Sequence, residues 1–215
     1  FHAPTPLAGH PAITVTAHPK LGLGRIGDHL LEIAGSEAVD LVVVGTSQKT
    51  GLGKLGSVSS AIVTGAHQSV ACIPPTAMVP VRVSAPMQRV VVATDGSAFA
   101  NRAVPYAYGL CAGQAHAEVH LIHVIDEDDQ TDQNALRNHL QRLVPTDAKA
   151  QTQIHILVGN KPADLLATTA ARLGADIICI ASHGRTGLAR ALVGSVADQL
   201  LRQTRLPVMV LRPSS

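Results

Sequence analysis

The sequence predicts an α/β protein made of two tandem, doubly wound parallel-sheet domains of the Rossmann-like type, and three observations predict it. Short runs rich in valine and isoleucine alternate with segments of helical periodicity along the 215 residues. Most of these runs are apolar throughout, which is typical of strands buried on both faces of a parallel sheet. The order of elements in residues 12–74 repeats the order in 153–213, and such a repeat indicates tandem copies of one unit.

The second copy contains every element that the fold needs. A strand is expected over 89–94, followed by the turn Asp95-Gly96-Ser97 and by one helix over 98–111. The next elements are expected, in strand and helix alternation, at 119–125, 132–143, 153–158, 162–173, 176–181, 195–202 and 206–211. Pro162 suits the first turn of its helix, since proline lacks the N–H that a helix leaves unpaired there.

The first copy contains only the later elements of that series. Strands are expected at 13–17, 40–45 and 69–74, with helices at 27–34 and from Gly56-Ser57 onward. This copy begins at what corresponds to the third strand of the second, so we expect further residues upstream of Phe1 in the natural protein. The predicted domains are therefore a partial, degenerate first domain (1–74), a proline-rich linker (75–87) and a complete second domain (88–215).

Composition excludes several classes of function. The net charge is only +2, and aromatic residues make up 2% of the chain, without any tryptophan. No run of basic residues is available to follow a phosphate backbone, so no nucleic-acid partner is expected. No apolar stretch approaches the ~18 residues of a membrane span, so no membrane partner is expected. The three cysteines are far apart and lie in apolar segments, which favours free thiols in a reducing, cytoplasmic compartment.

Two expected strand ends carry residues suited to a nucleotide. In an open α/β sheet, ligands bind beyond the carboxyl ends of the strands, where the strand order reverses. Asp95 follows one strand and can accept hydrogen bonds from ribose hydroxyl groups. A glycine-containing loop follows the strand at 176–181, and Gly194-Ser195 then begins a helix whose N-terminal N–H groups suit a phosphate.

The motifs together resemble the universal stress protein family. They are Ala-Thr-Asp-Gly-Ser (93–97), His-Val-Ile-Asp (123–126), Ser-His-Gly-Arg-Thr-Gly (182–187), Gly-Ser-Val (194–196) and Pro-Val-Met-Val-Leu (207–211). The resemblance implies a fold similar to the adenine nucleotide α-hydrolases. It also implies a stress-response regulator that binds ATP, ADP or AMP, with any Mg²⁺ held on the phosphates and at most slow hydrolysis. By resemblance, the nucleotide-binding residues are Ala93, Thr94, Asp95, Val124, Ile180, Ala181, Gly184, Arg185, Gly194, Ser195 and Val196.

The sequence departs from the family motif in both copies. Ala181 stands where nucleotide-binding members have the first glycine of the motif. In the first copy, Gln48 replaces the second glycine, and the loop before Gly56 is two residues shorter. A nucleotide-free dimerisation or scaffold module of the same fold therefore remains the main alternative, and an enzyme of the related α-hydrolase architectures ranks below it.

Three further expectations follow from the residues. The last strands of the two copies are apolar edges that need a partner. We expect 70–73 to pair with 208–211 within one chain, with exchange between two chains as the rival arrangement. The acidic run 126–129 is interpreted as a solvated loop. The histidines of the strands at 119–125 and 153–158 are expected at sheet edges or in hydrogen-bonded pockets.

Overall fold

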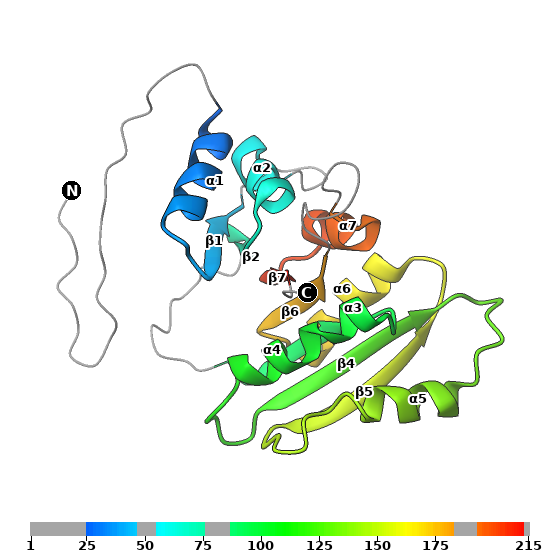
Figure 1. The fold of residues 1–215 in the computed structure, drawn as a ribbon. Coiled ribbons are helices and arrows are strands. Elements are labelled where there is room, and N and C mark those ends of the chain that lie inside the picture. The colour runs from blue at the N-terminus through cyan, green and yellow to red at the C-terminus, as the bar shows by residue number, and fades with distance from the viewer. Residues whose placement is uncertain (1–24, 47–54, 76–86, 183–192, 213–215) are drawn as a thin grey trace.

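The computed structural model describes residues 25–46, 55–75, 87–182 and 193–212, and these form one seven-stranded sheet covered by helices (Figure 1). The expected strand at 13–17 lies outside the described residues. The elements in chain order are α1 (Ile26–Ser36), β1 (Leu41–Gly45), α2 (Ser57–Gly65), β2 (Ser69–Ile73), β3 (Arg89–Ala93), α3 (Ala98–Asn101), α4 (Ala103–Leu110), β4 (Glu118–Ile125), α5 (Gln133–Gln141), β5 (Gln151–Val158), α6 (Pro162–Leu173), β6 (Ile177–Ala181), α7 (Ser195–Gln203) and β7 (Val208–Leu211).

The strand order is β1-β2-β7-β6-β3-β4-β5. All neighbouring strands are parallel except β2 and β7. Figure 1 shows the first copy, with α1 and α2, at one end of the sheet, and β4, β5 and α5 at the other. Within the second copy, β3 lies between β4 and β6, so the strand order reverses there. The predicted α/β class with mostly parallel strands is confirmed, and the strands of both copies form one continuous sheet.

The two copies meet where their last strands pair. β2 and β7 are antiparallel, with Val70 opposite Val210 and Cys72 opposite Val208. The predicted pairing of these strands within one chain is confirmed. It gives each strand a partner along an edge that otherwise presents unpaired N–H and C=O groups.

Apolar side chains alternate between the two faces of the sheet, as the period of a strand requires. One core lies between the sheet and helices α2, α6 and α7, with Val91, Ile178 and Val210 among its strand residues. The other lies under α4 and includes Val90 and Cys179. Because both faces are covered, the central strands are apolar throughout. None of the helices in the described ranges combines the length and apolarity needed to span a bilayer.

The structure differs from several of the expected element boundaries, most of them by one or two residues. The helix expected over 98–111 is divided into α3 and α4 at Arg102. Pro105 has no N–H for the carbonyl four residues earlier, at Asn101, and this weakens the helix where the division falls. The last strand begins at Val208 rather than at 206.

Candidate functional site

The first wall of the candidate site is the turn that follows β3. The N–H of Thr94 donates to the carbonyl of Ile122 at 3.0 Å, so the β3–β4 pairing extends one residue beyond the strand. Gly96 has a φ of +79°, a conformation that glycine adopts without strain. Ser97 then caps α3 by accepting from the N–H of Ala100 at 3.1 Å. This local chemistry places Asp95 at the tip of the turn.

Asn101 fixes the shape of that turn. Its Oδ1 accepts from the Thr94 hydroxyl at 2.8 Å, and its Nδ2 donates to the carbonyl of Gly96 at 3.1 Å. The Thr94 hydroxyl also accepts from the N–H of Gly96 at 3.1 Å. One side chain of α3 therefore holds both sides of the turn. No sequence motif marks Asn101, whose only signal is an amide side chain four residues after Ser97.

Asp95 is held in its charged form. Burial acts to raise its pKa, but hydrogen bonds from the Ser97 side chain and N–H outweigh burial, so the pKa lies below its ordinary value. The N–H of Ser97 donates to Asp95 Oδ1 at 2.9 Å. Asp95 is thus a carboxylate that can accept further hydrogen bonds from a ligand's hydroxyl groups.

The second wall is the N-terminus of α7. Ser182, the residue after β6, is 3% exposed, and its hydroxyl accepts from the N–H of Gly194 at 3.4 Å. Gly194 precedes the helix with φ −51° and ψ 146°. Within the described part of the chain, the N–H groups of Ser195, Val196 and Ala197 have no hydrogen-bond acceptor. Such groups, at the positive end of a nine-residue helix, suit an anion.

A cavity of about 460 Å³ lies between these walls, within the size range of ligand sites. It lies beyond the carboxyl ends of β3, β4 and β6, at the point where the strand order reverses. Gly184 and Arg185 lie outside the described residues. The other nine predicted site residues all line the cavity: Ala93, Thr94, Asp95, Val124, Ile180, Ala181, Gly194, Ser195 and Val196.

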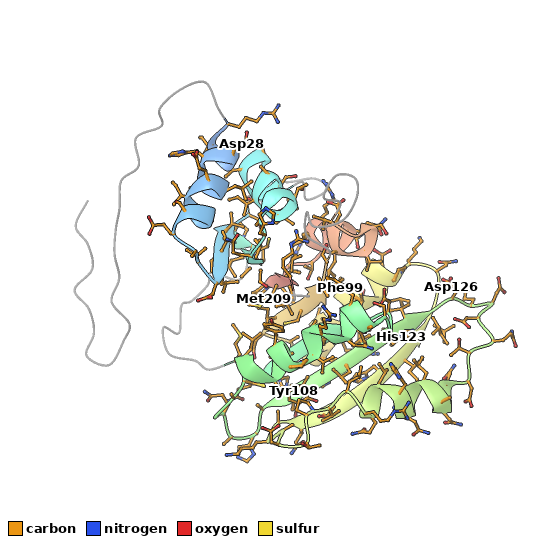
Figure 2. The ribbon with its side chains drawn as sticks, in the orientation of Figure 1. Asp28, Phe99, Tyr108, His123, Asp126 and Met209 are labelled. Carbon is orange, nitrogen blue, oxygen red and sulfur yellow. The ribbon has the colours of Figure 1, made fainter. Side chains whose placement is uncertain are left out.

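Further residues line the same cavity and were not predicted. Asp126 and Asp129, just beyond β4, contribute two carboxylates to it, and Figure 2 shows Asp126 at the end of that strand. The interpretation of the acidic run as a solvated loop alone is therefore incomplete. Gly159, Pro162 and Leu166 close the cavity from the end of β5 and the start of α6. Their proximity depends on β5 being next to β4, which chain order alone does not establish.

The charge on the cavity lining is negative among the described residues. Asp95, Asp126 and Asp129 contribute carboxylates, and no lysine or arginine is among the described lining residues. Hydrogen bonds from the Thr131 side chain and N–H lower the pKa of Asp129. Among the described residues, no group of three His, Cys, Asp or Glu side chains is placed so that it could hold a metal ion.

Two of the strand histidines form a separate cluster away from the cavity lining. His120 Nδ1 lies 3.1 Å from His155 Nε2, and His120 Nε2 lies 3.3 Å from Glu118 Oε2. This agrees with the expectation of a hydrogen-bonded pocket. The bond between the rings needs one nitrogen as acceptor, so at least one of the two rings must be neutral.

The histidine pair predicts a loss of stability in acid. Burial lowers the pKa of both His120 and His155 below the ordinary 6.5. The unfolded chain then binds more protons, so the free energy of unfolding falls as the pH drops below about 6.5. We expect urea denaturation to give a smaller free energy of unfolding at pH ~5.5 than at pH ~7.5 because of this pair. His155→Gln should reduce that difference, whereas the matched change at exposed His67 should preserve it.

Comparisons with known proteins agree on one family. The model of the universal stress protein family matches residues 8–74 and 86–212. A universal stress protein of Mycobacterium tuberculosis is 32% identical over 193 residues, which cover 83% of this chain and 64% of the relative. One from Methanocaldococcus jannaschii is 27% identical over 143 residues, covering 58% of this chain and 82% of the relative.

Solved structures show the same fold. The crystal structure of a universal stress protein from Archaeoglobus fulgidus aligns with a TM-score of 0.69 at 23% identity, covering 87% of this chain and 67% of that one. The chain therefore spans about two thirds of the length of the mycobacterial relative and of this structural neighbour. Because the family model matches most of the chain in two separate segments, the chain belongs to the universal stress protein family.

Proposed function

We propose that the second copy, residues 88–215, binds ATP or a related adenine nucleotide, and that the protein is a stress-response regulator rather than a dedicated catalyst. One observation carries the proposal. The nine described residues that the family resemblance selects come from β3 and the turn after it, from β4, from β6 and from the start of α7, and all of them line a single cavity. Segments 100 residues apart in the sequence meet there, at the switch point where α/β sheets bind their ligands.

Each wall of the cavity has a role in this proposal. Val124 and Ile180 supply apolar surface for the base. The Asp95 carboxylate accepts hydrogen bonds from the ribose hydroxyl groups. The phosphates bind at the N-terminus of α7, where Ser195 and Val196 present their N–H groups.

The acidic lining bears on the form of the nucleotide. Three carboxylates without a described lysine or arginine repel a polyphosphate at short range. A divalent cation carried on the phosphates offsets this repulsion, and Mg²⁺ is usually held by substrate phosphates and a few carboxylates. We therefore propose that ATP or ADP binds with Mg²⁺ on its phosphates, and that AMP binds without it.

The direct test is mass analysis of the small molecules released when the purified protein is denatured. We expect an adenine nucleotide among them. Purified protein that releases none and shows no heat on titration with ATP and Mg²⁺ contradicts the proposal.

We further predict one nucleotide per chain. Gln48 replaces a glycine of the motif in the first copy, and the loop before Gly56 is two residues shorter than its counterpart. The Thr94-Asp95 turn also has no counterpart among the described residues of the first copy. Calorimetric titration of the full chain should therefore saturate at a ratio near one. Two equivalent sites would contradict this.

The second candidate function is a nucleotide-free pairing module. The antiparallel β2–β7 contact favours it, because the two copies of the fold are joined there by the pairing of their last strands. An exchange of this contact, with β2 of one chain pairing with β7 of another, would give a homodimer. A protein that releases no nucleotide but retains a folded, ligand-independent assembly would favour this candidate.

A further inference from the structure

Arg212 lies directly after β7 and joins the two copies. Its Nη1 donates to the carbonyl of Ser182 at 2.9 Å, and its Nη2 donates to the carbonyl of Val63 in α2. Its backbone N–H donates to the Ser69 hydroxyl in β2 at 3.1 Å. One residue of the second copy thus contacts two elements of the first copy and the end of β6.

The contact with α2 provides a hydrogen-bond donor for the last turn of that helix. Val63 is within the last turn of α2, where backbone carbonyl groups have no partner inside the helix. A guanidinium group satisfies such a carbonyl, and its positive charge is favourable at the negative end of the helix dipole. The position of Arg212 is therefore linked to the position of the α2 C-terminus.

The contact with Ser182 connects Arg212 to the wall of the cavity. Ser182 is buried, and its N–H donates to the carbonyl of Leu211 at 3.0 Å. Its hydroxyl accepts from the N–H of Gly194, the residue immediately before α7. A continuous series of hydrogen bonds therefore runs from α2, through Arg212 and Ser182, to the N-terminus of α7.

Among its described residues, the first copy has no equivalent of this link. The N–H of Thr46 donates to the carbonyl of Ile73 at 2.9 Å, which repeats the bond between Ser182 and Leu211. By this correspondence Pro74 occupies the place of Arg212, and proline has no side-chain donor. The link therefore acts on the cavity of the second copy alone.

We propose that Arg212 is a positioning residue that couples the first copy to the phosphate end of the cavity, so that nucleotide affinity depends on the packing of α2. The effect on affinity rests on the nucleotide binding proposed above. In this arrangement the first copy regulates the second, although it lacks a complete motif of its own.

The affinity test uses the full chain and calorimetric titration with ATP and Mg²⁺. We expect Arg212→Met to weaken ATP binding about tenfold, the equivalent of roughly 1.4 kcal/mol. Arg212→Lys should also weaken it, because an ammonium group lacks the planar fork that reaches two acceptors. The matched control is Arg202→Met on α7. The Arg202 guanidinium group donates to Asp198 at 2.8 and 2.9 Å, and its loss should leave the affinity for ATP unchanged. Unchanged affinity in both Arg212 variants overturns the proposed coupling.

A second measurement needs no ligand and separates coupling from a structural role. A Cβ at Gly27 in α1 would overlap the Cβ of Ala61 in α2, and alanine has no rotamer that could relieve the overlap, so Gly27→Ala displaces α2. We expect this change to speed hydrogen exchange of the Gly194 amide several-fold by NMR in the wild-type background, and to have no effect in the Arg212→Lys background. Equal effects in the two backgrounds, or none in either, overturn the coupling. If the wild-type protein binds no ATP, the proposed function fails, and this exchange experiment still decides the coupling.

Discussion

Gly194→Val is expected to abolish nucleotide binding while leaving the fold intact. Gly194 has a negative φ of −51°, which any residue can adopt, and no atom of the described residues lies within 4 Å of a Cβ built there. The valine methyl groups therefore enter the open phosphate end of the cavity without disturbing the core. We expect affinity for ATP with Mg²⁺ to fall about 100-fold or more, the equivalent of roughly 2.8 kcal/mol. Calorimetric titration measures this loss.

The matched control for that variant is Gly109→Val. Gly109 is an exposed position in α4, a Cβ there also meets no atom within 4 Å, and it does not line the cavity. It should bind nucleotide as the wild type does. An unchanged affinity in Gly194→Val, with wild-type circular dichroism and thermal stability, would show that the phosphates bind elsewhere.

The sequence was sufficient for elements whose ends carry strong local signals. The predicted helix over 162–173 matches α6 residue for residue. It begins with Pro162 at a position that needs no N–H, and Gly174 ends it in the left-handed conformation with φ 65°. Both boundaries are determined by adjacent residues, so no knowledge of tertiary contacts was needed.

The sequence was insufficient where a feature depends on several elements at once. Asp126 and Asp129 belong to an acidic run that is also typical of a solvated loop, and only the neighbouring positions of β3 and β4 bring them to the cavity. Asn101 and Arg212 act through hydrogen bonds to backbone carbonyl groups of other segments. Backbone carbonyl groups are present at every position, so no sequence motif identifies which of them will accept a hydrogen bond from a distant side chain.

The pairing of β2 with β7 was predicted from a physical requirement, the need of an apolar edge strand for a partner, rather than from a motif. This pairing also predicts the substitution with the largest effect on stability. Val210 is 0% exposed and lies between Val70 on β2 and Ile180 on β6. A lysine there places an unpaired charge in the core, and we expect Val210→Lys to lower the free energy of unfolding by about 4 kcal/mol or more.

Val43→Lys is the same substitution on the outer strand β1, where the side chain is 62% exposed. Lysine is common on edge strands, so we expect a change within roughly 0.5 kcal/mol. Urea denaturation of the two variants measures both values under one set of conditions. If β7 were instead an open edge in solution, Val210 would lose the cover of β2 and α2, a lysine there could reach water past that edge, and the two variants would differ less. A large difference between them is therefore the expected result of a sheet that continues from the first copy into the second.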